Sequence, residues 1–301
     1  MANLTYLAQR LYNRPLWATQ TLADTVQSVL AHRMKMSPIL AVGAKLDSGA
    51  ELPEFTSPKE PMLMDGVLTI PILGGLAHRG DALDAECGMQ SYTNLQNMLV
   101  MSVKDPAVKG VLLDIDSGGG EEAGCLDFAD TIMELRKEKP IWGIANGMAC
   151  SAAYAILASC TRAAMTQTGD VGSIGVVGIH ADHSKMLEKE GVAISFIYAG
   201  EHKIDGNSAQ PLSDAARANW QANIDESYER FVTAVAARRP MSADQVKATK
   251  AKVFGSKTAL ELGLVDAVSS FEATRRELSS SVKSGTPGGV RMINGEPVIW
   301  Q

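Results

Sequence analysis

The sequence predicts an α/β protein whose mainly parallel sheet is covered by helices and followed by a helical C-terminal part. Residues 108–115 form a continuous apolar run of the kind that is buried on both faces of a sheet. Residues 91–103 instead carry apolar side chains at helical spacing. Such segments alternate between about residues 64 and 198, and beyond residue 211 only helical spacing continues. This order is typical of βαβ units joined to a helical segment.

Each expected strand is a short apolar run bounded by turn residues. The first follows Asp65-Gly66, a pair that favours a turn. The same criterion predicts strands at 67–73, 108–115, 141–145, 163–165, 173–179 and 192–198, and a last short strand after Asp266.

The helices are expected where apolar side chains recur every three to four residues. The longest candidate, 213–238, has Ile224, Tyr228 and Phe231 on one face, which predicts an amphipathic helix. The full set of expected helices is 4–11, 21–32, 91–103, 121–137, 151–159, 184–190, 213–238, 243–250 and 256–262.

Three regions are expected along the chain. Residues 1–60 are interpreted as an N-terminal extension and linker, because 47–62 are rich in proline, acidic and small polar residues. Residues 61–278 form the folded domain. Residues 279–301 are rich in serine and glycine, which predicts a disordered tail.

Composition excludes several classes of function. The net charge of -6 argues against a nucleic-acid-binding protein, which would carry a basic face. The four cysteines (Cys87, Cys125, Cys150 and Cys160) form no CxxC pair, which predicts reduced thiols and a cytoplasmic protein. The sequence has neither a signal-peptide pattern nor an apolar run of about 20 residues, so no membrane anchor is expected.

One hydroxyl stands where an apolar run gives way to a helical segment. Residues 141–144 are apolar, Asn146-Gly147 is a turn signal, and a run of small residues follows Ala149. Ser151 lies at the change, among the unpaired N–H groups at the positive end of a helix dipole. Those groups can stabilise an oxyanion. The alternative interpretation is that Ser151 only caps the helix.

Two other segments have chemical potential but are weak alone. Gly118-Gly119-Gly120 follows a buried strand and lets the backbone approach a ligand closely. This run lacks the spacing of a dinucleotide site and the lysine of a P-loop, so no cofactor is expected. Lys203 lies in a polar loop, where an ordinary surface lysine is the alternative.

The segments taken together resemble the signal peptide peptidase A family of serine peptidases, which includes phage head-maturation proteases. The similar motifs are DSGGG (116–120), GMACSAAY (147–154), TGDVGSIGV (168–176), AGEHKIDGNSAQPLSD (199–214), FVTAVAARR (231–239) and FGSKTALELGLVDAV (254–268). The resemblance implies a Clp/crotonase-like fold and a catalytic dyad of Ser151 and Lys203. It also implies an oxyanion or substrate site at Gly118, Gly119 and Ser173. Two family glycines after the serine are alanines here, and the family's proline in the SPGG turn is missing.

The resemblance also carries expectations about partners. It implies a protein or peptide substrate and a homo-oligomer whose neighbouring subunits share active sites. The segment from Arg10 to Leu16 and the missing anchor favour the phage branch, with capsid, scaffold or portal proteins as partners in the host cytoplasm. A peptidase that degrades signal peptides or cytosolic peptides is the alternative within the family.

A lysine accepts a proton near neutral pH only when burial lowers its pKa from about 10.4. Lys203 is therefore expected to leave water and approach the Ser151 hydroxyl, which is a poor nucleophile without a base.

Other chemistries remain open from the sequence. His180, Asp182 and His183 cluster after the Gly-rich strand and could complete a triad, although they lack the further ligands of a metal site. Cys150 is a weaker candidate nucleophile, since no histidine lies in its motif. A crotonase-like acyl-CoA enzyme would use the Glu121-Glu122 pair, and an assembly protein with an inactive site would use none of these residues.

Overall fold

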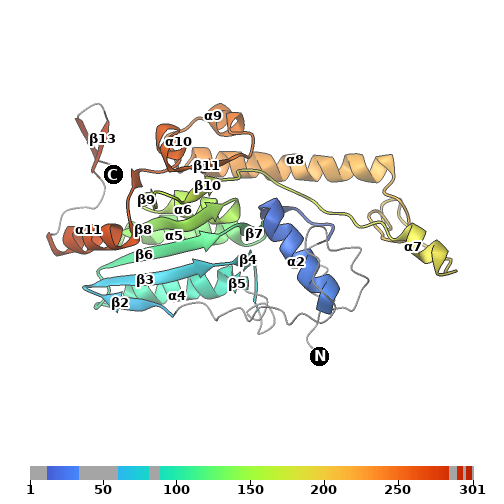
Figure 1. Cartoon of the computed structure of the whole chain (residues 1–301), viewed down its shortest axis with the longest axis horizontal. Coiled ribbons are helices and arrows are strands. Elements are labelled where there is room, and N and C mark those ends of the chain that lie inside the picture. The colour runs from blue at the N-terminus through green and yellow to red at the C-terminus, as the bar shows by residue number, and fades with distance from the viewer. Residues whose placement is uncertain (1–11, 34–59, 81–88, 285–289, 294–295, 300–301) are drawn as a thin grey trace.

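The computed structural model describes residues 12–33, 60–80, 89–284, 290–293 and 296–299 (Figure 1). A large sheet with the strand order β11-β10-β8-β6-β3-β2 lies at its centre, and β9 and β12 branch from β8. The strands of this sheet are β2 (Met62–Met64), β3 (Val67–Leu73), β6 (Gly110–Ser117), β8 (Ile141–Cys150), β9 (Arg162–Met165), β10 (Asp170–Gly172), β11 (Val253–Gly255) and β12 (Ala267–Val268). β3, β6, β8 and β10 are mutually parallel, which confirms the predicted α/β class.

A second, smaller sheet stands at the carboxyl ends of β3 and β6. Its order is β1-β7-β4-β5, built from β1 (Leu16–Ala18), β7 (Gly119–Glu121), β4 (Gly75–Ala77) and β5 (Met89–Ser91). β7 continues from β6 after Gly118 alone, so the predicted glycine turn links the two sheets.

Helices cover both faces of the large sheet (Figure 1). The helices of the described chain are α2 (Gln20–Arg33), α4 (Tyr92–Lys104), α5 (Cys125–Leu135), α6 (Ala152–Ser159), α7 (Ser184–Lys189), α8 (Asp214–Ala236), α9 (Ala243–Ala248), α10 (Ser256–Glu261) and α11 (Phe271–Ser284). Successive side chains of β6 point to opposite faces of the sheet and therefore pack against different helices. Val111 and Leu113 join the main core with α4, α5 and α6, whereas Leu112 packs with Leu278 of α11.

The predicted turn at Asn146-Gly147 is wrong, because β8 continues through it to Cys150. Two carboxylates of β6 explain why. Asp114 accepts a hydrogen bond from Asn146 Nδ2 at 3.0 Å, and Asp116 accepts one from the Met148 amide at 3.0 Å. These bonds hold the chain extended past the turn signal.

Two other predicted strands are also wrong. Residues 173–179 follow β10 in irregular conformation, since Ser173 has φ 52° and ends the ladder, and only Val177 forms an isolated bridge, with Leu16. Residues 192–198 form no regular strand and pair with no strand of the described chain. Ile197 is 101% exposed and Val192, Ile194 and Tyr198 are about half exposed, so the apolar side chains that suggested a strand are largely uncovered in this single chain.

The two ends of the folded region also differ from expectation. Helix α11 continues to Ser284 and buries Ser279, and β13 (Val290–Ile293) pairs with β14 (Glu296–Ile299), so the tail predicted from residue 279 is structured in these parts. At the other end, β1 and α2 lie on the core rather than in a separate extension. The helix expected at 4–11 and most of the expected linker fall outside the described residues, as does Cys87.

Candidate active site

Ser151 occupies a sharp junction between a strand and a helix, as predicted. β8 ends at Cys150 and α6 begins at Ala152, and Ser151 between them has φ 56° and ψ -121°. A non-glycine residue in this conformation is strained, and such strain concentrates at functional sites. The Ser151 amide donates to the Gly172 carbonyl oxygen at 2.8 Å, which fixes the junction against β10.

The hydroxyl of Ser151 is buried and unused. The residue is 0% exposed, and its Oγ has no hydrogen-bond partner in the part of the chain that the structure describes. The side chain does not cap α6, so the capping interpretation fails. An unpaired buried hydroxyl costs stability and calls for an explanation beyond packing.

The glycine turn lies directly beside this junction. A Cβ atom on Gly119 would sit 3.0 Å from the Ala152 nitrogen and 3.0 Å from the Cys150 carbonyl oxygen. Ala152 is the first residue of α6, so its N–H has no partner within the helix and points along the positive end of the dipole. The Gly119 amide donates to Ser117 Oγ at 3.1 Å, so this N–H already has a partner within the turn.

Ser173 belongs to the same neighbourhood through its backbone. It follows Gly172, whose carbonyl holds the Ser151 amide, and its own amide donates to the Lys252 carbonyl oxygen at 2.8 Å. Its side chain is half-buried. The structure thus brings Ser151, Gly118, Gly119 and Ser173 together from three separate segments.

Lys203 is not part of this cluster within one chain. It is exposed, whereas Ser151 is fully buried, and the two side chains form no hydrogen bond. Lys203 lies in the segment 180–212, which we call the arm. Figure 1 shows the arm, with α7, extending to one side of the sheets along the N-terminal half of α8.

The first strand of the chain is a site component that the sequence analysis missed. β1 pairs antiparallel with β7, with Ala18 opposite Gly119. Trp17 is fully buried, stacks on Phe231 of α8 with 4.0 Å between ring centroids, and donates from Nε1 to Ser227 Oγ at 2.9 Å. The signal was the apolar Leu16-Trp17 pair directly after Pro15, within a segment interpreted as an extension.

The histidine alternatives are not assembled around Ser151. His180 contacts Trp220 edge to face at 5.7 Å between ring centroids, and His183 precedes α7. Hydrogen bonds from the side chain and the amide of Ser184 hold the pKa of the Asp182 carboxyl below the usual value. Within the described ranges, no three histidine, cysteine or acidic side chains are grouped as metal ligands.

The remaining candidate groups have other roles. Burial raises the pKa of the Cys150 thiol to about 12, with a smaller contribution from Asp170, so the thiolate needed for nucleophilic attack is absent near neutral pH. Glu121 accepts the His78 amide at 2.7 Å, and Glu122 forms an ion pair with Arg230 at 2.8 Å. These contacts disfavour the acyl-CoA interpretation.

The chain is similar in sequence to a known peptidase family. Residues 133–284, which include Ser151, Lys203 and the segments around Ser173 and Asp266, match the model described as Peptidase family S49. This chain belongs to peptidase family S49. The α/β architecture is accordingly of the Clp/crotonase-like type, as the resemblance implied.

Individual relatives extend the similarity beyond that segment. The chain is 34% identical over 298 residues to the head-tail preconnector protein GP5 of Enterobacteria phage P21, covering 94% of this chain and 60% of the relative. It is 33% identical over 303 residues to the capsid assembly protease C of Escherichia phage lambda, covering 96% of this chain and 69% of that protein. A putative signal peptide peptidase SppA of Enterococcus faecium is 28% identical over 222 residues, covering 72% and 64%.

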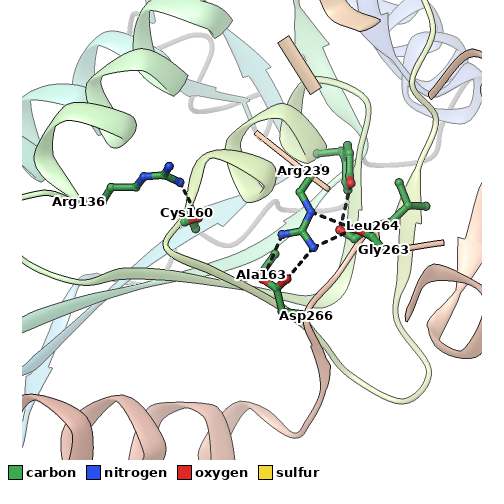
Figure 2. Close-up of polar contacts among 8 residues, drawn as sticks. Arg136, Cys160, Ala163, Arg239, Gly263, Leu264 and Asp266 are labelled. Atoms are coloured by element: carbon green, nitrogen blue, oxygen red, sulfur yellow. Dashed lines mark hydrogen bonds and ion pairs between the residues drawn. The ribbon is translucent and has the colours of Figure 1, made fainter. Parts of the chain in front are cut away.

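The S49 segment also contains a buried polar network behind α6 (Figure 2). Arg239, after α8, donates to the Gly263 carbonyl oxygen and to both carboxylate oxygens of Asp266. Asp266 in turn accepts the Ala163 amide of β9 at 2.8 Å. Tyr154 of α6 donates to the Leu264 carbonyl oxygen at 3.0 Å. The two C-terminal motifs, 231–239 and 254–268, therefore brace the helix that carries Ser151.

Over the described residues of this S49 chain, no helix is both long enough and apolar enough to cross a membrane.

Proposed function

We propose that this chain is a serine endopeptidase in which Ser151 is the nucleophile and Lys203 of a neighbouring subunit is the general base. The observation that carries the proposal is the buried, unpartnered Ser151 Oγ at a strained strand-to-helix junction, beside the first amides of α6. A serine held in this way projects from the sheet toward donors that can stabilise a tetrahedral oxyanion. Membership of family S49 supports the peptidase class.

The proposed reaction uses only groups of the chain and the substrate. Neutral Lys203 Nζ takes the proton from Ser151 Oγ as Oγ bonds to the scissile carbonyl carbon. The carbonyl oxygen becomes an oxyanion, held by the amides of Gly118 and Ala152. When the C–N bond breaks, the lysine returns the proton to the leaving amine. Water then hydrolyses the acyl-enzyme with the same lysine as base.

The position of the arm supports a base supplied by a second subunit. Lys203 is exposed in the single chain and lies apart from the buried Ser151 hydroxyl. The arm also exposes a row of large apolar side chains, namely Val192 (48%), Ile194 (47%), Ile197 (101%) and Tyr198 (51%). Exposed apolar side chains that are contiguous along the chain mark an interaction surface. Docking of the arm on a neighbour would bury these residues together with Lys203, and burial disfavours the charged ammonium.

The substrates that we propose are proteins of phage capsid assembly. This rests on the names of the two relatives aligned over nearly the whole chain, a capsid assembly protease and a head-tail preconnector protein. The head-tail preconnector protein is longer, and this chain spans 60% of it. Such processing would take place in the host cytoplasm, and the net charge of -6 fits a protein substrate better than a nucleic acid.

Subunit mixing tests the nucleophile, the base and the shared site together. Ser151→Ala and Lys203→Ala proteins should each be inactive against a capsid or scaffold protein, and a mixture should recover about a quarter of the wild-type rate after subunit exchange. Lys189→Ala, another exposed lysine of the arm region, is the matched control and should keep full activity. Activity retained by purified Ser151→Ala protein would refute the nucleophile. A mixture that stays inactive despite demonstrated exchange would refute the shared site.

A further inference from the structure

The N-terminal strand lies in a groove between two segments of the candidate site. On one side Leu16, Trp17 and Ala18 pair with β7. On the other side the Leu16 amide donates to the Val177 carbonyl oxygen at 2.9 Å, and the Val177 amide donates back to Leu16 at 3.0 Å. β1 is therefore an inserted strand that is antiparallel to both of its neighbours.

The hydrogen bonds continue beyond β1 in both directions. The Thr19 amide donates to the Gly118 carbonyl oxygen at 2.9 Å, and the Asn13 amide donates to the Ile179 carbonyl oxygen at 3.1 Å. Asn13 Nδ2 also donates to the Gly206 carbonyl oxygen at 3.0 Å, in the loop of Lys203. One short stretch of chain thus runs from the proposed oxyanion turn to the loop of the proposed base.

This stretch also passes close to the nucleophile. A Cβ on Gly119 would lie only 2.2 Å from the Trp17 carbonyl oxygen and 3.0 Å from the Ala152 nitrogen. The Trp17 carbonyl therefore lies against the same turn and helix start that flank Ser151. Ser151 is 0% exposed in this arrangement, so a protein substrate cannot reach its Oγ while the groove is filled.

Side-chain contacts show how the groove holds an extended chain. The Trp17 side chain is held by α8: its ring stacks on Phe231, and its Nε1 donates to Ser227 Oγ. We call this position the slot of Trp17. Addition of a strand between existing strands, with a pocket for a large side chain, is a common way to bind extended peptides. The neighbouring helix α2 is less tightly packed, because an apolar cavity remains between Leu22 and Val26 of α2 and Leu76 of β4.

We propose that residues 13–19 are a resident pseudosubstrate: they occupy the groove that receives an extended substrate peptide, and they must leave before Ser151 can react. This inference rests on the proposed function for its catalytic consequence. The ligand class is an extended peptide with a large aromatic or apolar side chain for the slot of Trp17. The competing explanation is that β1 is a permanent structural strand.

The first experiment changes how firmly β1 is held in the full-length protein. Leu16→Pro removes the amide that donates to Val177, whereas the matched control Leu16→Ala loses the side chain but keeps the amide. Loss of one backbone hydrogen bond should raise the rate of Ser151 labelling by a fluorophosphonate about tenfold relative to Leu16→Ala.

A covalent lock provides the opposite change and a second variant. Leu16 and Val177 exchange backbone hydrogen bonds and their side chains pack together, so paired cysteines there have the separation that a disulfide needs. Leu16→Cys combined with Val177→Cys, oxidised with glutathione disulfide, should lose labelling, and dithiothreitol should restore it. The Leu16→Cys single variant, treated identically, should be labelled at the same rate before and after oxidation.

A binding measurement separates the groove from the chemistry. A fluorescent, end-capped peptide with the sequence of residues 12–20 should bind the Leu16→Pro protein at least about tenfold more tightly than the oxidised double variant. Equal binding to both, or labelling as fast in the locked as in the reduced protein, would overturn the inference while leaving the proposed function intact. If the peptide discriminates but Ser151 is never labelled in any variant, the proposed function fails and the peptide groove stands.

Discussion

Arg239 and Asp266 form a buried, bidentate ion pair. This pair connects the end of α8 to β9, because Asp266 also accepts the Ala163 amide. Arg239 Nη2 lies 2.8 Å from Asp266 Oδ1, and Nη1 lies 3.0 Å from Oδ2 (Figure 2). Burial lowers the pKa of the Arg239 guanidinium, but the hydrogen bonds and charge of Asp266 outweigh it and raise the pKa overall. Nε and Nη2 also donate to the Gly263 carbonyl oxygen, so each guanidinium nitrogen donates at least one hydrogen bond.

Arg239→Ala should lower the free energy of unfolding by about 3–5 kcal/mol, because it leaves the Asp266 carboxylate partly buried without its counter-charge. The control is Lys137→Ala, which removes an ion pair with Glu134 in which both side chains are largely exposed. That change should cost less than about 1 kcal/mol. Urea denaturation measures both, and equal effects would show that the buried pair does not brace the fold.

Replacement of the proposed nucleophile should separate stability from activity. Ser151→Ala should abolish cleavage yet raise the free energy of unfolding by about 1 kcal/mol, since it removes an unpaired buried hydroxyl. Ser159→Ala is the matched control in the same helix, because Ser159 Oγ is buried but donates to the Ala155 carbonyl oxygen at 2.8 Å. This control should be destabilised by about 1 kcal/mol. If both variants shift the unfolding midpoint in the same direction, the hydroxyl of Ser151 has a partner after all.

The chemistry of the proposed base predicts a different outcome for a conservative change. Lys203→Arg should be as inactive as Lys203→Ala, because a guanidinium does not release its proton in the pH range where proteins are folded. Single-turnover fluorophosphonate labelling of Ser151 is the measurement. Labelling of the arginine variant at the wild-type rate would mean that Lys203 contributes charge or position rather than basicity.

The glycine turn should tolerate substitution unevenly. A Cβ on Gly120 would lie 1.8 Å from the Leu76 carbonyl oxygen, a backbone atom that cannot move aside without breaking the contact between β7 and β4. A Cβ on Gly118 meets the Thr19 hydroxyl at 2.8 Å, and that side chain can rotate. Gly120→Ala should therefore lower the thermal midpoint far more than Gly118→Ala. Similar midpoints for the two variants would contradict the close approach of β4.

The described thiols should be chemically silent until the protein unfolds. Burial raises the pKa of Cys125, Cys150 and Cys160 to about 12 in each case. At pH 8 only about one molecule in 10⁴ then carries a given thiolate, so iodoacetamide should modify these residues only in denaturant. Lys189→Cys, at an exposed position, provides a reactive control. Mass spectrometry of the alkylated peptides would reveal any exception.

The same shifts fix the sign of a pH effect at the alkaline end. Between about pH 9 and pH 12 the thiols ionise in the unfolded chain but not in the folded one. The raised pKa values therefore contribute stability that is present below pH 9 and is lost as the pH rises. The urea midpoint should fall across this range, and less steeply in a Cys160→Ala variant.

The sequence predicted elements well where local pattern and tertiary packing agree. The run 67–73 is β3 and the spacing in 213–238 is α8, because β3 is largely buried and α8 buries Phe231, Val232 and Val235. The position of Ser151 was predictable for the same reason, since an apolar strand and a run of small helical residues leave only a short junction between them.

Prediction failed where distant groups decide the backbone. Asn146-Gly147 is a strong turn signal, but Asp114 and Asp116, some 32 positions away in sequence, hold it extended. Residues 192–198 have the composition of a strand but no partner strand within the described chain, and a local pattern cannot show whether a partner is present. Trp17 was assigned to an extension because nothing local indicates that Phe231 lies beside it.

Helix α6 has no solvent-facing position: all eight of its residues are buried, from Ala152 to Ser159. Mutational drift at this helix is therefore limited to exchanges between side chains of nearly equal volume. Under the proposed function, new cleavage preferences would therefore have to arise in the walls of the proposed groove, such as α8 around Phe231 and the segment around Val177. A randomised library aimed at altered specificity would best spare α6 and sample those two segments.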